Sequence, residues 1–309
     1  EQDRFSIAPE LEKSPDGGWR DYVRGTLAIL AGAGFDLTGA DIAIAGDIPR
    51  GAGLSSSASL EVGVATAMLA LAGHDAEPRQ VALLAQAAEN DFVGVRCGNL
   101  DQLAAAASVA DSALLIDCRS LDLTPVPLPS DTVVMIVQSG VTRELVEGEY
   151  NRRRQECEEA AAALGVTALR DVDIETLGAA RDRLRPIAHA RARHIVTENA
   201  RTLAAAQALA SGDLPAMGRL MAESHASQRD DFDITVPATD RLAALMQEAI
   251  GDRGGARQTG GGFGGAVIGL MVEARAEAVR EHVLAHYTTP AGTPPDIYID
   301  RAHAGACIL

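Results

Sequence analysis

The chain has 309 residues, a formal net charge of −16 and a hydrophobic fraction of 47%. This length suits one large domain or two ordinary ones, and the composition is that of a globular protein with a sizeable core. The acidic charge argues against nucleic acid or an anionic membrane as a partner, because both attract basic surfaces.

The sequence carries no signal for export or for membrane insertion. Its first residues lack the basic region and the apolar run of a signal peptide, and no stretch of about 18 uninterrupted apolar residues follows. The four cysteines form no C-x-x-C pair and no zinc-like cluster, so we expect free thiols. These features favour a cytoplasmic protein.

The first third of the chain predicts three helices and one strand before a break in the pattern. Residues 19–31 place their apolar side chains on one helical face, and residues 60–71 are rich in Ala, Leu and Met. Residues 40–48 alternate apolar with small or polar residues, which is typical of a strand. Residues 78–92 predict another helix, and the segment 94–102 breaks the pattern before an alanine-rich helix.

The rest of the chain changes character near Gln138, where we place a boundary between domains at residues 1–138 and 139–309. Before it, residues 113–117 and 132–137 predict strands, and the second is uniformly apolar, as in a central strand. After it, helical patterns dominate until a second glycine-rich loop leads into a final strand–helix–strand pattern. The expected elements are helices at 142–164, 186–210, 214–228 and 273–286, with strands at 266–270 and 296–300.

The stretch Pro49-Arg50-Gly51-Ala52-Gly53-Leu54-Ser55-Ser56-Ser57-Ala58-Ser59 joins the predicted strand to a predicted helix. Glycines allow a sharp turn and close approach to a ligand, and a helix start offers unpaired N–H groups. The three serines add hydroxyl donors and a candidate metal ligand, so the loop predicts an anion site, most naturally for phosphate. It lacks the spacing of a P-loop or a Rossmann loop. The alternative is a glycine turn capped by serine.

Two carboxylates follow at positions that suit phosphoryl transfer. That reaction needs a phosphate cradle, a divalent cation and often a carboxylate that orients or deprotonates the acceptor hydroxyl. Ser56 and Glu89 could hold Mg²⁺, which prefers oxygen ligands. Asp101 would then be free to act on the acceptor. The alternatives are that Asp101 is a helix N-cap and that Glu89 is a solvated helix residue.

The serine-bearing loop resembles the second signature of the GHMP small-molecule kinases, and Thr259-Gly260-Gly261-Gly262-Phe263-Gly264-Gly265 resembles the third. Within that superfamily the chain is most similar to the galactokinases, and the resemblance covers essentially the whole chain. The further segments that carry it are 19–25, 98–102, 113–121, 149–154, 191–201 and 221–237.

The resemblance implies a role for each matching residue. Asp101 would be the catalytic base facing the anomeric hydroxyl of the sugar, and Glu89 with Ser56, or alternatively Ser57, would hold magnesium. Trp19 would lie by the nucleotide base, and the loop 259–265 would close beside the phosphates. The phosphates would be wrapped by Gly51, Ala52, Gly53, Leu54, Ser55, Ser56 and Ser57. The sugar would be contacted by Gly98, Asp101 and Tyr150.

Structural alternatives remain for three of these assignments. Trp19 could be a core residue, Tyr150 a half-buried packing residue, and 259–265 a tight turn that enters a strand.

The fold implied by the resemblance is α+β, with two domains. The first would resemble ribosomal protein S5 domain 2, the second would be ferredoxin-like with added helices, and the active site would lie in the cleft between them. The implied reaction is ATP-dependent phosphorylation of galactose to α-D-galactose 1-phosphate, with ATP and Mg²⁺, in a monomer or weak dimer. The alternatives are a kinase for a related sugar such as N-acetylgalactosamine, or a non-catalytic galactose and ATP sensor. The pair Ser57-Ala58, which such sensors lose, favours an enzyme.

Two departures from the galactokinase pattern stand out. The sequence contains no G-E-H-x-D run, the family's first signature, which binds the sugar. We therefore expect a first domain truncated at its start, with an exposed sheet edge and weak or no galactokinase activity from this chain alone. Asn99-Leu100 stands where the family usually has Ile-Met, which could shift sugar preference.

Overall fold

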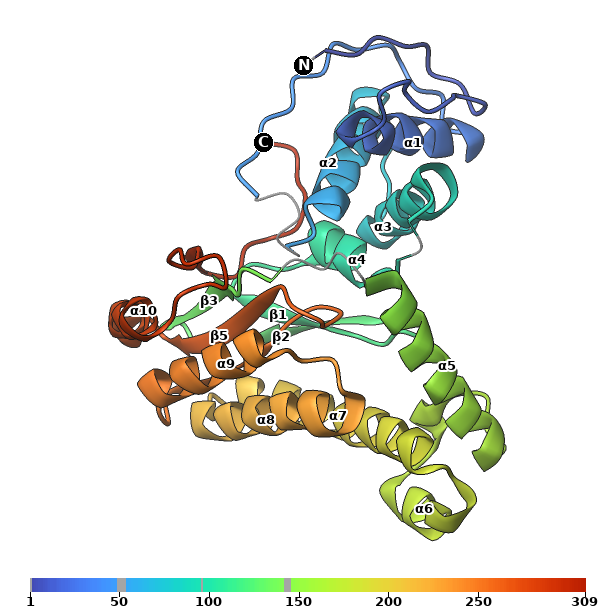
Figure 1. The fold of residues 1–309 in the computed structure, drawn as a ribbon. Coiled ribbons are helices and arrows are strands. Elements are labelled where there is room, and N and C mark those ends of the chain that lie inside the picture. Colours follow the sequence, from blue (N-terminus) through green and yellow to red (C-terminus); the bar gives the residue numbers. More distant parts are fainter. Residues whose placement is uncertain (1, 49–53, 96, 142–145) are drawn as a thin grey trace. The chain divides into compact units, whose positions relative to one another are not determined.

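A computed structural model describes residues 2–48, 54–95, 97–141 and 146–309. The chain forms two compact units (Figure 1). We call residues 1–126 with 302–309 the amino-terminal unit, and residues 127–301 the carboxy-terminal unit. The mixture of helices with small sheets confirms the expected α+β class. A domain boundary near Gln138 stays a proposal.

The amino-terminal unit is built mainly from four helices that share one core (Figure 1). Each helix contributes a buried apolar residue, namely Leu30, Met68, Val81 and Leu103. The α1 residues Val23, Leu27 and Leu30 recur at helical spacing, which explains why this face turns inward. The elements are α1 (Trp19–Gly32), α2 (Ser56–Leu71), α3 (Pro78–Ala87), the π-helix η1 (Ala88–Val93), α4 (Leu100–Ala107), β1 (Ser112–Ile116) and β2 (Leu123–Pro127).

The carboxy-terminal unit contains an antiparallel sheet in the order β4-β5-β3-β6. Met135 of β3 and Met271 of β5 meet Met246 of α9 and Val279 of α10 in a fully buried core. The interior position of β3 confirms the prediction of a central strand. The strands are β3 (Thr132–Gln138), β4 (Gly254–Gln258), β5 (Ala266–Val272) and β6 (Ile297–Asp300).

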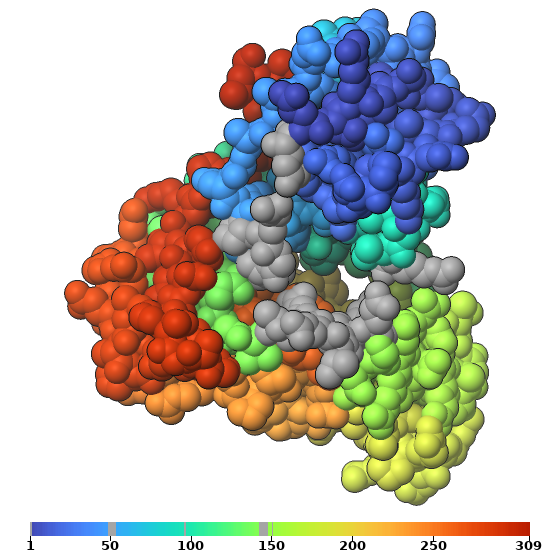
Figure 2. Space-filling view, turned by 45° about the horizontal axis from the view of Figure 1, so that its top comes forward, coloured from blue at the N-terminus to red at the C-terminus, as the bar shows by residue number. Residues whose placement is uncertain are grey.

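Helices make up the rest of the carboxy-terminal unit. Figure 2 shows α5 and α6, in light green to yellow, away from α10, in red. A separate apolar cluster joins α5, α6 and α7 through residues such as Ala160, Leu177 and Ala192. The helices are α5 (Val146–Leu164), η2 (Leu169–Asp171), α6 (Ile174–Ala179), η3 (Arg181–Arg183), α7 (Pro186–Ala210), α8 (Leu214–Ser227), the π-helix η4 (Gln228–Phe232), α9 (Pro237–Ile250) and α10 (Glu273–His286).

The strand predicted over residues 40–48 is wrong for this structure. These residues form no regular element, and Ile42, Ile44 and Ile48 are 42%, 45% and 40% exposed. Alternation of side chains specifies the two faces of a strand but supplies no hydrogen-bonding neighbour. No segment in the described part of the chain pairs with these residues.

Two expectations drawn from composition can be compared with the structure. All four cysteines are free thiols. None of the helices within the described ranges combines the length and the apolar character that a membrane span requires.

Candidate active site

Glu89 lies in the π-helix η1, where the wider turn carries its side chain inward. Two backbone N–H groups, those of Gly94 and Val95, donate to the Glu89 carbonyl at 2.9 and 3.0 Å and close this turn. Gly94 ends the π-helix in the left-handed region. The Glu89 side chain is only 6% exposed, so the alternative of a solvated helix residue is excluded. Single π-turns of this kind are frequent at functional sites.

Three segments donate hydrogen bonds to the Glu89 carboxylate. Ser57 Oγ of α2 donates to Oε1 at 3.0 Å, and Gln102 Nε2 of α4 donates to Oε2 at 2.7 Å. The Cys97 thiol donates to Oε2 at 3.4 Å. Together these bonds fix the orientation of the carboxylate. The carboxylate therefore ties α2, α4 and the 97–99 segment to η1.

Cys97 is a structural donor in this arrangement. Its backbone N–H donates to Asn90 Oδ1 at 2.8 Å, and its carbonyl accepts from Gln86 Nε2 at 3.1 Å. Burial and the nearby charge of Glu89 raise the pKa of the Cys97 thiol to about 12. The thiol stays protonated at neutral pH and is an unreactive donor.

Glu61 of α2 is a second, fully buried carboxyl beside Glu89, and sequence reasoning missed it. Gln102 Nε2 lies 3.4 Å from Glu61 Oε2. Burial, together with the charge of Glu89, raises the pKa of Glu61 to about 8, so it is mostly protonated at neutral pH. A sequence signal was present: Glu61 is the one charged residue of α2, between the buried residues Ala58 and Ala65.

Asp101 lies in the first turn of α4, one residue before the Gln102 that contacts Glu89. The N-cap of α4 is Asn99, which excludes the alternative of Asp101 as the cap. Asp101 lines a pocket of about 660 Å³ in the amino-terminal unit, together with Ser55 and Ser59 of the serine-bearing loop. The volume lies in the range of small-molecule sites, about 300–1,000 Å³.

The serines of the loop have different surroundings. Ser55 adopts the left-handed conformation, with φ 55°, and is the N-cap residue of α2, so it stands at the positive end of that helix. It lines the pocket with Leu54, whereas Ser57 turns toward Glu89. Ser56 is the first residue of α2. The predicted phosphate ligands Gly51, Ala52 and Gly53 lie outside the described residues.

The remaining predicted site residues are spread over both units. Trp19 opens α1 and packs half-buried against the amino-terminal core, and Gly98 is exposed just before α4. Tyr150 belongs to α5, and its side chain lies outside the described residues. The loop 259–265 connects β4 to β5 in the carboxy-terminal unit.

The donor set fits a magnesium ion. Mg²⁺ prefers oxygen ligands and usually takes one or two from the protein, with waters and phosphates completing its shell. Ser57 and Glu89 offer a hydroxyl oxygen and a carboxylate oxygen 3.0 Å apart. In the described residues no group of three His, Cys, Asp or Glu side chains forms a metal cluster. A metal held here would therefore depend on a ligand such as a nucleotide phosphate.

Comparison with known proteins identifies two family models along the chain. Residues 21–108 match the GHMP kinases N terminal domain, and residues 205–289 match the GHMP kinases C terminal domain. The structure is similar to that of Lactococcus lactis galactokinase complexed with galactose, with a TM-score of 0.85 and 33% sequence identity. That match covers 97% of this chain and 79% of the Lactococcus chain.

More distant structures share the fold. Streptococcus pneumoniae phosphomevalonate kinase in complex with phosphomevalonate and AMPPNP is 17% identical, with a TM-score of 0.59, over 94% of this chain and 82% of that chain. L. major mevalonate kinase in complex with R-mevalonate is 15% identical, with a TM-score of 0.60, over 93% of this chain and 78% of that chain. At these identities the similarity shows the fold alone.

The raised pKa of Glu61 predicts a pH-dependent stability that Glu61→Gln removes. Between pH 4.5 and about 8 the folded protein holds a proton on Glu61 that the unfolded chain has released, so the free energy of unfolding falls as pH rises. From pH 5 to pH 8 the loss amounts to about 3.5 kcal/mol, because the slope is roughly 1.4 kcal/mol per pH unit and flattens as the pH approaches the folded pKa. Urea unfolding at both pH values should show a smaller fall for the variant than for the wild type. Glu10→Gln, at an exposed site of the same unit, is the control, and identical pH dependence in all three proteins would contradict the prediction.

Proposed function

Because this chain belongs to the GHMP kinase family, we propose that it transfers the γ-phosphoryl group of ATP to the anomeric hydroxyl of galactose. The products would be α-D-galactose 1-phosphate and ADP. The observation that carries the proposal is the set of contacts among Ser57, Glu89 and Gln102. Ser57 and Glu89 form a candidate metal-ligand pair, and Gln102 is the neighbour of Asp101 in α4. The similarity to a galactokinase bound to galactose supports the choice of sugar.

Asp101 is the proposed catalytic base. Its carboxylate takes the proton of the anomeric hydroxyl as that oxygen forms a bond to the γ-phosphorus. The bond between the γ-phosphorus and the bridging oxygen of ADP breaks in the same step, and ADP leaves with the electron pair. The exposed position of Asp101 in the pocket supports this role, because the acceptor must reach the carboxylate from solvent.

The serine-bearing loop and the start of α2 are the proposed phosphate site. The helix N-terminus offers unpaired N–H groups and a positive dipole end, and Ser55 and Ser59 add hydroxyl groups at the pocket wall. Local donors are needed because the chain carries a net charge of −16. Mg²⁺, held by Ser57 and Glu89, would neutralise phosphate charge. Positioning of the two substrates supplies much of the remaining rate.

Sugar-dependent release of ADP tests the proposed reaction directly. A panel of galactose, N-acetylgalactosamine, glucose and mannose should give the highest kcat/KM with galactose. A preference for N-acetylgalactosamine would assign the related-sugar alternative, for which Asn99 and Leu100 beside Asp101 are candidate determinants. Binding of ATP and galactose with no turnover of any sugar would favour the sensor.

Replacing the base should remove turnover and leave nucleotide binding intact. We expect Asp101→Asn to lower kcat by about 100-fold to 10,000-fold, the usual contribution of a general base. The affinity for ADP, measured by calorimetry, should change less than twofold, since Asp101 contacts the acceptor only. Asp75→Asn, the same change at an exposed site of the same unit, is the control. An Asp101→Asn variant with wild-type kcat would exclude the assignment.

The two candidate serine ligands can be separated by alanine substitution. We expect Ser57→Ala to raise the Mg²⁺ concentration needed for half-maximal ADP binding by about tenfold or more, because one of two protein ligands is lost. Ser56→Ala is the matched control, and we expect it to leave this value nearly unchanged. A large effect of Ser56→Ala with none from Ser57→Ala would assign the metal to Ser56.

A further inference from the structure

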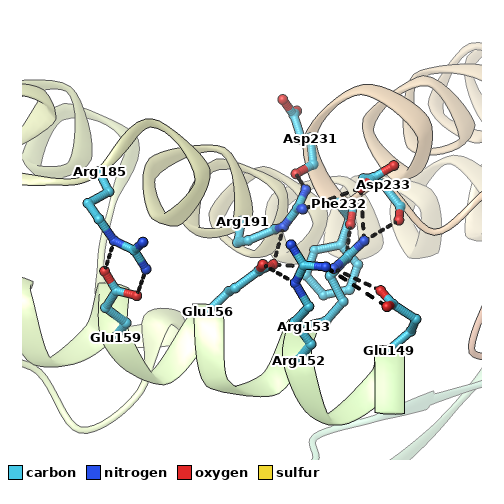
Figure 3. Close-up of polar contacts among 10 residues, drawn as sticks. All are labelled: Glu149, Arg152, Arg153, Glu156, Glu159, Arg185, Arg191, Asp231, Phe232 and Asp233. Carbon is cyan, nitrogen blue, oxygen red and sulfur yellow. Dashed lines mark hydrogen bonds and ion pairs between the residues drawn. The ribbon is translucent and has the colours of Figure 1, made fainter. Parts of the chain in front are cut away.

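In the described part of the carboxy-terminal unit two arginines are buried, far along the chain from the proposed base. Arg153 of α5 is 5% exposed and Arg191 of α7 is 6% exposed. Figure 3 shows both guanidinium groups pointing at the turn that ends η4. A buried cation is costly unless its donors are paired, so the partners of these two groups decide what they do.

The partners are the carbonyl groups of three consecutive residues in this turn. Arg191 Nη1 donates to the Asp231 carbonyl at 2.6 Å, and Arg153 Nε donates to the Phe232 carbonyl at 2.7 Å. Arg153 Nη2 donates at 2.8 Å both to the Asp233 carbonyl and to Asp233 Oδ2. Two rigid guanidinium forks therefore hold the backbone of residues 231–233 from one side.

Glu156 fixes the two arginines relative to each other. It accepts from Arg191 Nε at 2.7 Å and from Arg153 Nη1 at 3.4 Å. Burial by itself would raise the pKa of Glu156, but the hydrogen bond and charge of Arg191, together with the charges of Arg153 and Arg152, lower it. An ionised carboxylate between two cations is the arrangement in which such a buried group persists.

The turn needs this support because its backbone is unusual. Asp233 has φ 56° and ψ 53°, in the left-handed region that few residues other than glycine adopt without cost. Phe232 is held by stacking on His194, with ring centroids 4.3 Å apart. Arg153 binds both the backbone and the side chain of Asp233, so it is the side chain best placed to stabilise this conformation.

Ile234, the residue after the turn, binds the second glycine-rich loop. The Ile234 carbonyl accepts from the Phe263 N–H at 2.6 Å and from Gln258 Nε2 at 3.1 Å. Gly262 lies so close that a Cβ atom there would be 2.6 Å from the Ile234 carbonyl oxygen, and its φ is +89°. The Arg153 guanidinium also lies 5.6 Å from the centre of the Phe263 ring, within cation–π range.

From this chain of contacts we propose that Arg153 is a positioning residue for the loop 259–265. Arg153 binds the turn 231–233, and the turn fixes the position of the Ile234 carbonyl. That carbonyl accepts a hydrogen bond from the Phe263 N–H and so fixes Phe263 in the loop. The proposal rests on the proposed function and on the role that the family resemblance implies for the loop 259–265, which is to lie beside the nucleotide phosphates. Loss of Arg153 should therefore weaken the nucleotide site and leave galactose binding unchanged.

The test compares Arg153→Lys with Arg154→Lys. Lysine keeps the charge opposite Glu156 but lacks the guanidinium fork, and the side chain of the control residue Arg154 is 72% exposed. In Arg153→Lys we expect the amide hydrogens of residues 259–265 to exchange about tenfold faster, as when a local opening loses a charge-assisted hydrogen bond. The KM for ATP should rise about tenfold, because a loop shifted from its position contacts the phosphates less well. The KM for galactose should stay within twofold.

Asp233→Asn is the second variant, in case Arg153→Lys fails to fold. Asparagine tolerates the left-handed region, and the Asp233 side chain is 68% exposed, so the fold should survive while the ion pair to Arg153 is lost. We expect faster exchange of residues 259–265 and a higher KM for ATP, both by smaller factors than in Arg153→Lys.

Three results would overturn the proposal. They are unchanged exchange of residues 259–265, equal increases in both KM values, and faster exchange spread evenly over the whole unit, which would give Arg153 a general stabilising role only. The exchange measurement needs no turnover, so it decides the proposal even if the chain phosphorylates no sugar.

Discussion

The hydrogen bonds to the buried carboxylate of Glu89 are the interactions on which the amino-terminal unit depends most. A buried carboxylate must find donors, and Ser57, Gln102 and Cys97 supply them from three different segments. The neighbouring Glu61 avoids a second buried charge by keeping its proton. Satisfying one charge therefore fixes α2, α4 and the π-turn together, and Asp101 and the start of α2 take their places from those helices.

In the carboxy-terminal unit the buried charged groups that connect distant segments are cations. Two buried guanidinium groups are satisfied by backbone carbonyls, and Glu156 balances their charge. The structure held in this way is a turn, and through Ile234 a glycine loop. In each unit a buried ionic group connects segments that lie far apart in the sequence. Glu89 of η1 contacts α2 and α4 in the amino-terminal unit, and the arginines of α5 and α7 bind the turn 231–233 in the carboxy-terminal unit.

The sequence predicted those features that local pattern or a motif determines. The periodicity of residues 19–31 specified α1, and the uniformly apolar run 132–137 specified an interior strand. Prediction from the sequence was wrong where a distant partner decides the secondary structure. Residues 40–48 have the alternation of a strand but no hydrogen-bonding neighbour in the described chain. Helical phase about α2 selects Ser57 over Ser56 for the contact with Glu89, and motif spacing alone left both open. The Arg153 contacts depend on tertiary packing, which one sequence does not reveal, whereas Glu61 left a signal as the one charged residue of α2.

The central claim is that Ser57, Glu89 and Asp101 form one site for a metal nucleotide and an acceptor hydroxyl. A crystal structure of the protein with Mg²⁺ and ADP tests it most directly. The account predicts Mg²⁺ at about 2.1 Å from Ser57 Oγ and a Glu89 carboxylate oxygen. The phosphates should lie at the start of α2, with the Asp101 carboxylate in the same pocket. Nucleotide bound elsewhere, or a Ser57–Glu89 hydrogen bond left intact beside a metal with other ligands, would contradict it.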